Sequence, residues 1–366
     1  MMFLPGKRDD AAGRFYPPGS REWAAAVLRH VGERIGVRRT HVVNLDVGTT
    51  TRMRLSVEHI GPEDVPTHWF TKLPSLSWKA RRASGFPRAF EREVKMYRHV
   101  LADLPVETPR CLFGALRGRG RTLVLEDLTH YEAQTRLAGD VLTVDEAHQA
   151  VVTLAKFHAA LWASERFAHD LSWLRHRTDD ANGWVTAVLR SKLCKQGLKR
   201  SAPRLSSKLN VMLGRWFANR AEAKTKLHGD SVTLVHGDCH AGHLYWRHGV
   251  PGFVDWQNAT CAEGIGDVAS LLVTSLDTQE RREEERSLVE SYAETLRSQG
   301  VVDARSDLLW ERYRLHTVGP LERWLIASSL SHSNETKGEV VQRSHQVLER
   351  LFIAVEDHDS LSRVLS

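Results

Sequence analysis

The sequence predicts an α+β protein with two unequal lobes, a smaller lobe built on an antiparallel sheet and a larger helical lobe. Strand-like stretches dominate up to about residue 128, and helical periodicity dominates beyond about residue 143. A chain of 366 residues is also longer than one compact core usually requires. Because 42% of the residues are hydrophobic and 26% are charged, we expect folded structure nearly throughout.

The amino-terminal part combines one helix with several strands. Apolar residues at helical spacing, among them Trp23, Val27 and Val31, predict a helix over residues 20–36 that lies on a sheet. Strands are expected at 41–46, 51–59 and 68–73, an amphipathic helix at 89–104, and a hairpin at 111–116 and 122–125. This pattern predicts a small antiparallel sheet.

The carboxy-terminal part is mainly helical. Strong periodicity predicts helices over residues 144–162, 206–228 and 276–300, with a short β-like centre at 233–255. We expect three segments: an extension with its helix (1–36), an N-lobe (37–130) and a C-lobe (131–366).

Composition bears on the binding partners and the cellular compartment that we expect for the protein. The net charge of +6 is mild and spread along the chain, so no nucleic-acid partner is expected. Four scattered cysteines, Cys111, Cys194, Cys239 and Cys261, predict no disulfide framework and a reducing compartment. No stretch reaches the ~18 apolar residues of a membrane helix, which predicts a soluble, cytoplasmic protein without a membrane partner.

Two carboxylates follow short apolar strands in the predicted β-like centre. His236-Gly237-Asp238-Cys239-His240 follows Leu234-Val235, and Asp255-Trp256-Gln257 follows Phe253-Val254. Phosphoryl transfer needs one carboxylate to orient a hydroxyl and another to hold Mg²⁺ against phosphate oxygens. Asp238 suits the first role and Asp255 suits the second.

These two motifs resemble the aminoglycoside phosphotransferase and choline kinase-like family, nearest its ecdysteroid-kinase-like branch. Further matching pieces occur in the family's order over most of the chain: Phe70-Thr71-Lys72-Leu73-Pro74, Phe90 to Tyr97, Leu125 to Leu128, Leu154 to Ala159 with Trp162, and Gly266 to Ala269. The resemblance implies a bilobal protein-kinase-like fold, with a nucleotide-binding N-lobe and a catalytic and substrate-binding C-lobe. Fold alone does not fix an activity.

The resemblance assigns roles in the N-lobe. Lys72 would grip the α- and β-phosphates, and Glu93 would pair with Lys72 and orient it. Without the rest of the pattern, these would be an edge-strand lysine and a solvated helix residue. Gly48, Thr49 and Thr50 lie where the family covers the phosphates, although a plain hairpin turn would use the same residues. Backbone groups of Glu126 to Leu128 would bind the adenine edge.

In the C-lobe, the resemblance makes His236 and Asp267 supports of the loop that carries Asp238. Asp267 is also open to interpretation as a helix N-cap after Gly266. His158 fits either the family pattern or ordinary core packing.

His243 departs from the family's pattern, because the residue five after the first carboxylate is normally Asn, a ligand of Mg²⁺. Imidazole prefers softer metals than Mg²⁺. The sequence therefore leaves open a kinase with altered metal use, a kinase that relies on Asp255 alone, and a pseudokinase. The expected cofactors are ATP and Mg²⁺, with Mn²⁺ as an alternative.

Two rival chemistries use the same stretch. Cys239, His240 and His243, with His236 and His248 nearby, could form a zinc site, but the spacing lacks the pairs of structural zinc sites. Cys239 beside His240 could form a thiol nucleophile, but sequence neighbours rarely present a thiol to an imidazole.

The predicted function is ATP-dependent transfer of the γ-phosphate to a hydroxyl of a small molecule or of a peptide Ser or Thr. The alternative is a pseudokinase with a weakened metal site that binds a partner or acts as a scaffold, for example within a peptide-modifying complex. Acidic runs at 283–285 and 357–359 and basic residues over 192–204 give an aminoglycoside acceptor no special support, and the basic residues suit an acidic peptide.

Overall fold

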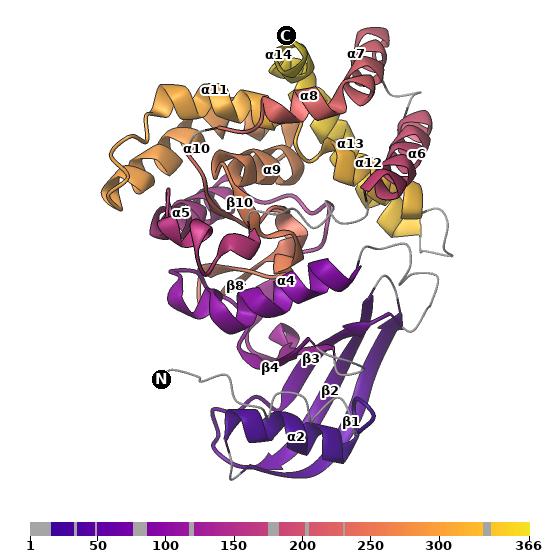
Figure 1. Cartoon of the computed structure of the whole chain (residues 1–366), viewed down its shortest axis with the longest axis vertical. Coiled ribbons are helices and arrows are strands. Elements are labelled where there is room, and N and C mark those ends of the chain that lie inside the picture. Colours follow the sequence, from indigo (N-terminus) through magenta and orange to yellow (C-terminus); the bar gives the residue numbers. More distant parts are fainter. Residues whose placement is uncertain are drawn as a thin grey trace. The chain divides into compact units, whose positions relative to one another are not determined.

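The computed structural model describes residues 16–32, 35–47, 50–75, 86–116, 121–174, 183–201, 205–229, 231–331 and 338–366. The chain forms two compact units (Figure 1). The first contains Met1–Asp103 and Thr108–Gln134, and the second contains Leu104–Glu107 and Thr135–Ser366. The predicted α+β fold is confirmed. The predicted divisions near residues 36 and 130 stay predictions.

Within its described residues, the first unit is built on a five-stranded antiparallel sheet in the order β1-β2-β3-β5-β4. The strands are β1 (Gly36–Val47), β2 (Thr50–Ile60), β3 (His68–Pro74), β4 (Cys111–Ala115) and β5 (Thr122–Glu126). β3 lies between β2 and β5, with Lys72 opposite Arg52 on one side and Leu123 on the other. Lys72 is therefore in a central strand, not at an edge.

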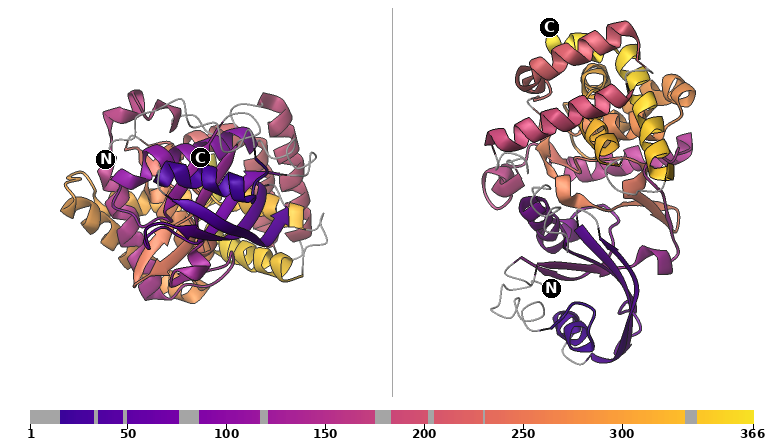
Figure 2. Two further views of the ribbon diagram at one scale, coloured as in Figure 1. Left: turned by 90° about the horizontal axis from the view of Figure 1, so that it is seen from below. Right: turned by 90° about the vertical axis from the view of Figure 1, so that its right-hand side faces the viewer.

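Helix α2 (Arg21–Val31) lies across one face of this sheet (Figure 2). Ser20 caps its first turn, and Trp23 and Val27 are fully buried against sheet residues such as Leu55 and Trp69. The predicted helix over the sheet is confirmed, but its predicted end at Gly36 is wrong. Gly32 ends the helix, and Gly36 is already the first residue of β1.

Helix α4 (Phe86–His99) packs beside β4, where Val94 and Arg98 approach Gly114 so closely that a side chain there would crowd them. Its predicted bounds were three residues late at the start and too long at the end, because the last part is a separate 3₁₀ turn, Leu101–Asp103. Such 3₁₀ turns are frequent at helix ends.

The second unit is mainly helical. The structure describes α5 (Val144–Ala160), α6 (Gly183–Ser201), α7 (Ser207–Ala218), α8 (Arg220–Thr225), α9 (Ile265–Ser275), α10 (Thr278–Ser298), α11 (Ser306–His316), α12 (Leu321–Ser331), α13 (Gly338–Asp357) and α14 (Ser360–Leu365). The predicted single helix over 206–228 is wrong. Asn219 ends α7 and bonds back to Arg215 through its side chain, so the chain turns there before α8.

Short strands form the β-like centre of this unit. β7 (Thr233–Val235) pairs antiparallel with β10 (Thr260–Ala262), and β8 (Leu244–Arg247) forms a hairpin with β9 (Val250–Phe253). A further short strand, β6 (Ala133–Thr135), lies where the chain passes from the first unit to the second. The pairing of β7 with β10 brings the segments after β7 and before β10 together.

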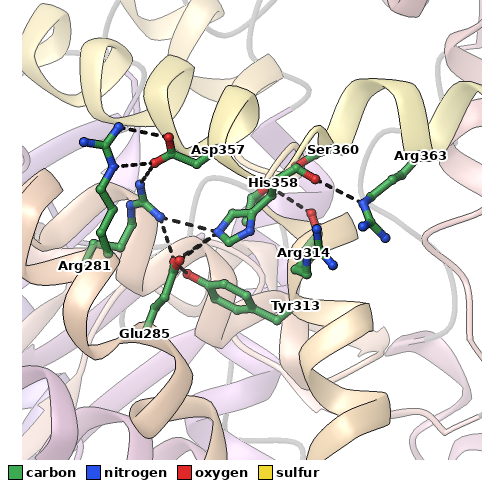
Figure 3. A network of polar contacts seen from close by, with 10 residues as sticks. Arg281, Glu285, Tyr313, Arg314, Asp357, His358, Ser360 and Arg363 are labelled. Carbon is green, nitrogen blue, oxygen red and sulfur yellow. Dashed lines mark hydrogen bonds and ion pairs between the residues drawn. The ribbon is translucent and has the colours of Figure 1, made fainter.

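A buried polar network ties three helices of the second unit together (Figure 3). Arg281 of α10 pairs with Glu285 at 2.7 Å and with Asp357 at the end of α13. Glu285 also accepts a hydrogen bond from the Tyr313 hydroxyl of α11 at 2.7 Å and lies 3.0 Å from His358 Nε2. Buried charges are tolerated when they are paired in this way.

Among the helices that the structure describes, none combines the length and the apolar character needed to cross a bilayer.

Candidate active site

Lys72 and Glu93 form a buried ion pair in the first unit. Lys72 Nζ on β3 lies 2.7 Å from Glu93 Oε1 on α4, and both side chains are buried. A lysine and a glutamate are rarely buried unless they are paired. The solvated-residue interpretation is therefore wrong for both, while their role toward phosphates stays a prediction.

The predicted adenine linker follows β5. The Glu126 carboxylate is buried and accepts the Arg110 backbone N–H at 2.9 Å, so this side chain stabilises the fold. Leu128 begins a 3₁₀ turn, Leu128–His130, that Asp127 caps through Thr129. Gly48 and Thr49 lie outside the described residues, and Thr50 is the first residue of β2.

The Asp238 loop of the second unit depends on Gly237. This glycine has φ +80°, and a Cβ atom at that position would lie 2.2 Å from the Asn258 carbonyl oxygen. The left-handed backbone and the lack of space together require glycine. The loop after β7 therefore packs directly on the turn that follows Asp255.

His236 and Asp267 hold this loop from two sides. Asp267, in the first turn of α9, accepts the backbone N–H groups of His236 at 2.6 Å and Gly237 at 2.9 Å. Gly264 occupies the N-cap position of α9, so the N-cap interpretation of Asp267 is wrong. The His236 ring donates from Nε2 to the Val254 carbonyl at 2.8 Å and accepts the Asp238 N–H at 3.3 Å through Nδ1. One imidazole thus links the segments that carry both carboxylates.

Asp267 and His236 are both buried, and burial opposes the charged form of each. Asp267 is nevertheless ionised, whereas His236 is neutral. For Asp267, the adjacent His158 and His236 and the Gly237 backbone N–H outweigh burial and lower the pKa of the carboxyl. His158 is fully buried, 3.4 Å from Asp267 through Nε2 and 2.8 Å from the Tyr292 hydroxyl through Nδ1. Burial lowers the pKa of His236, which fits its neutral tautomer. His158 therefore both packs in the core and supports Asp267.

Both oxygens of Asp238 have partners. Oδ1 lies 3.0 Å from Arg323 Nε of α12, and Oδ2 accepts Asn258 Nδ2 at 3.2 Å. Burial would raise the pKa of Asp238, but the charge of the adjacent Arg323 outweighs burial and lowers the pKa below its usual value. The carboxylate is therefore ionised and oriented.

His243 and Asp255 form a nitrogen–oxygen pair suited to a cation. His243 Nδ1 lies 2.8 Å from the Asp238 carbonyl oxygen, which can only accept, so Nδ1 carries the proton. The other nitrogen, Nε2, lies 3.5 Å from Asp255 Oδ2. Metal-binding histidines typically donate their second N–H to such a carbonyl. The residues present therefore fit a divalent cation held by Asp255 and His243.

The backbone at Asp255 supports this placement. Asp255 is left-handed, with φ +66° and ψ +55°, immediately before the 3₁₀ turn Trp256–Asn258. A non-glycine residue rarely adopts this conformation, and such residues gather at functional sites. The fully buried Trp256 anchors the turn against the rings of Phe157 and His236.

The rival chemistries fit less well. Within the described residues, the grouping that could hold a metal contains Asp238, His240 and His243 and does not include Cys239. Burial raises the pKa of the Cys239 thiol well above its usual value, the opposite of an activated nucleophile. Burial lowers the pKa of His240 to about 3, so this ring is neutral. His248 lies in the exposed turn between β8 and β9. The thiol interpretation and the use of Cys239 in a zinc site are therefore not supported, although His240 and His243 do lie within reach of a common metal ion.

Sequence reasoning missed Asn258 and Arg323. Asn258 lies three residues after Asp255, so a polar residue in that turn offered a weak signal. Arg323 lies on a helix that the sequence reading did not predict, and no motif marks it.

The fold, the Lys72–Glu93 pair and the loop with two carboxylates define a two-unit protein of the protein-kinase-like class. The model of the phosphotransferase enzyme family matches residues 60–350. The chain belongs to this family of kinases and phosphotransferases, as the motifs predicted. The ecdysteroid-kinase-like branch stays a prediction.

Matches to individual curated proteins cover only a short part of the chain. The serine/threonine protein kinase RdoA of Salmonella typhimurium is 42% identical over 66 residues, which are 18% of this chain and 19% of that protein. The chain thus matches about a fifth of the length of its curated relatives.

Two solved structures resemble the whole fold. The GDP and kanamycin complex of APH(2")-IIia is 13% identical, covers 91% of this chain and 98% of its own, and has a TM-score of 0.53. A choline kinase from Cryptosporidium parvum Iowa II is 9% identical, covers 92% and 96%, and has a TM-score of 0.51. At such identities the likeness shows the fold alone.

Proposed function

We propose that the chain is an ATP-dependent phosphotransferase that moves the γ-phosphate to a hydroxyl of a small molecule or of a peptide Ser or Thr. One observation carries this proposal. The ionised Asp238 carboxylate contacts Arg323 and Asn258, and it lies in the same pair of packed loops as His243 and Asp255, the two side chains that could bind a metal ion. Family membership supports phosphoryl transfer, and the GDP named in the kanamycin complex supports a nucleoside triphosphate as the phosphate donor.

Asp238 would orient the acceptor. The acceptor oxygen attacks the γ-phosphorus, and the bond from that phosphorus to the β–γ bridging oxygen breaks. ADP leaves with the electron pair, and the hydroxyl proton passes to the Asp238 carboxylate and then to solvent. Little covalent work is left to the protein, so positioning and charge stabilisation would provide most of the rate.

Lys72 and the cation would stabilise the phosphates. Lys72, oriented by Glu93, would bind the α- and β-phosphates, and backbone groups of Glu126 to Leu128 would bind the adenine edge. A divalent cation, Mg²⁺ or Mn²⁺, when bound by Asp255 and His243, would neutralise the charge on the phosphate oxygens.

The test is metal-dependent binding and slow hydrolysis of ATP by the purified chain. Asp238→Asn should lower turnover by about 10²- to 10⁴-fold with little change in nucleotide affinity. Asp255→Asn should weaken nucleotide binding only when a divalent cation is present. Asp307→Asn, which removes an exposed carboxylate paired with Arg305, is the matched control and should change neither quantity.

A pseudokinase is the second candidate, because His243 replaces the expected Asn. Nucleotide binding that needs Lys72 but leads to no turnover, with any acceptor or metal, would favour it. If the chain binds no nucleotide, both candidates fail.

A further inference from the structure

The carboxylate that would orient the acceptor is already paired with an arginine. Arg323 Nε lies 3.0 Å from Asp238 Oδ1, and the Arg323 side chain is 34% exposed. Asn258 occupies the other oxygen at 3.2 Å. An acceptor hydroxyl that approaches Asp238 must therefore meet the Arg323 guanidinium.

Arg323 is fixed in this position by its helix. Its neighbours Glu322 and Trp324 are both buried. Trp324 packs its ring on His240 of the Asp238 loop, with the ring centroids 5.3 Å apart, and Glu322 pairs with Arg220 at 2.8 Å. The backbone of α12 is thus anchored beside the loop, while the Arg323 side chain extends to the carboxylate.

Most of the hydrogen-bonding capacity of Arg323 is not used by Asp238. Among the residues that the structure describes, Asp238 is its ion-pair partner, and the contact at Nε does not have hydrogen-bond geometry. A guanidinium offers several N–H donors in a planar fork that matches a carboxylate or a phosphate. The guanidinium can therefore accept an anion without leaving the site.

The positive charge of Arg323 favours an anion over a cation, and the helix that packs on α12 also carries basic residues. Helix α6, which packs on α12, exposes three lysines at helical spacing, Lys192, Lys195 and Lys199. Arg200 of α6 donates to the Ser328 and Ser329 carbonyls of α12 at 3.2 Å and 2.7 Å. The acid next to Arg323, Glu322, is neutralised by Arg220. A cationic acceptor would meet like charge at Arg323.

We propose that Arg323 is the residue that selects the acceptor, and that the acceptor carries a carboxylate or phosphate group close to its reactive hydroxyl. This inference rests on the proposed function and names its substrate class. The anionic group of the acceptor binds the Arg323 guanidinium in place of Asp238 Oδ1. Asp238 Oδ1 is then free to accept a hydrogen bond from the acceptor hydroxyl. Without an acceptor, Arg323 keeps Asp238 engaged and limits the transfer of phosphate to water. Specificity would thus combine attraction of the right acceptor with exclusion of cationic ones.

The first test needs no knowledge of the acceptor. ATP hydrolysis without acceptor is compared in the wild type, Arg323→Gln and Arg305→Gln, the last replacing an exposed arginine whose ion pair lies on α11. We expect Arg323→Gln to raise hydrolysis several-fold and Arg305→Gln to leave it unchanged. Unchanged or lower hydrolysis in a folded Arg323→Gln protein overturns the inference, and a lower rate would mean that Arg323 acts on the transferred phosphate.

The second test separates acceptors by charge. The probes are L-serine against ethanolamine, glycerate against glycerol, and a serine peptide flanked by Glu against the same peptide flanked by Lys. The member of each pair that carries the additional carboxylate should have the higher kcat/KM. Arg323→Gln should remove about tenfold to a hundredfold of that advantage, as expected for a lost charged hydrogen bond, and Arg323→Lys should keep part of it.

Preference for the cationic or neutral probes, an anionic advantage that survives Arg323→Gln, or the absence of any response to the anionic probes contradicts the inference. Failure of the proposed function looks different, because the wild type itself would then show no metal-dependent ATP hydrolysis that Asp238→Asn removes.

Discussion

The protonation of a single ring nitrogen decides what His243 can do. The Asp238 carbonyl fixes the proton on Nδ1, so Nε2 directs its lone pair toward the Asp255 carboxylate 3.5 Å away. A divalent cation bound between these two atoms would be coordinated by both. An imidazole ligand favours Mn²⁺ over Mg²⁺ more than an amide oxygen does.

His243→Asn should therefore shift metal preference toward Mg²⁺. With Mn²⁺ and a non-hydrolysable ATP analogue, electron spin echo spectroscopy of the wild type should show coupling to an imidazole nitrogen, and the variant should lose it. Turnover in Mg²⁺ relative to Mn²⁺ should rise several-fold. His248→Asn, in the exposed turn, is the control. A nitrogen signal that persists in His243→Asn, or that is absent from the wild type with Mn²⁺ bound, would exclude His243 as a ligand.

At the scale of single elements, the first turn of α9 fixes the backbone of the loop that contains Asp238. Asp267 accepts two successive backbone N–H groups, and its lowered pKa shows that its surroundings favour the charged form despite burial. Since Asp267 does not touch the proposed reacting atoms, it is a positioning residue.

Asp267→Asn should lower kcat by at least about tenfold, with little change in the KM for ATP, because it loosens the loop of Asp238 without touching the nucleotide. It should also destabilise the fold by about 1–3 kcal/mol. Asp277→Asn is a matched control, since Asp277 caps α10 through the Gln279 N–H at 2.8 Å, away from the loop. Urea unfolding and steady-state kinetics measure both effects. Equal losses of kcat in the two variants would assign Asp267 to stability alone.

Elements with strong local signals were predicted well. Trp23 and Val27 recur with helical period, and Lys72 lies in an apolar run, so α2 and β3 were found. The break at Asn219 was missed, because the apolar period continues through it and the turn comes from a side-chain bond to Arg215. Arg323 was missed for another reason. Its contact with Asp238 joins residues far apart in the sequence, and only the packing of α12 brings them together.

Across the second unit, the network around Arg281 fastens α10, α11 and the end of α13 (Figure 3). Burial would raise the pKa of Glu285, but its bonds to His358, Arg281 and Tyr313 outweigh burial and lower it. A carboxyl whose pKa is lowered in the folded state stabilises the fold above its ordinary pKa, here 4.5. That stabilisation is lost as the pH falls through the folded-state value.

Glu285→Gln should cost about 3 kcal/mol at pH 7, because it removes the charge that Arg281, Tyr313 and His358 share and leaves Arg281 with Asp357 alone. The difference from the wild type should start to shrink below pH 4.5 and disappear as the pH falls through the lower folded-state pKa of Glu285, where the wild-type carboxyl also becomes neutral. Urea unfolding at a series of pH values measures it. Glu290→Gln, which breaks an exposed pair with Arg286, should cost much less at every pH. A pH-independent difference for Glu285→Gln would show that shape, not charge, sustains the network.

The sequence was informative about the two units and about both carboxylates because each leaves a local pattern. It was silent on the network of Arg281, in which Arg281 and Glu285 are buried while their neighbours Arg282 and Glu283 are exposed. Which side of that helix faces inward depends on α11 and α13, two helices that the sequence reading did not predict.

The close approach of Gly237 to Asn258 has a consequence for engineering. No side chain fits at position 237, because it would collide with the Asn258 carbonyl. A substitution in the loop of Asp238 at this contact therefore requires a change in the turn of Asp255 as well. A library aimed at new acceptors is better directed at α12, where Arg323 points to the carboxylate from a separate element. The same contact means that a graft of this loop into another scaffold has to carry residues 236–238 and 255–258 together as one piece.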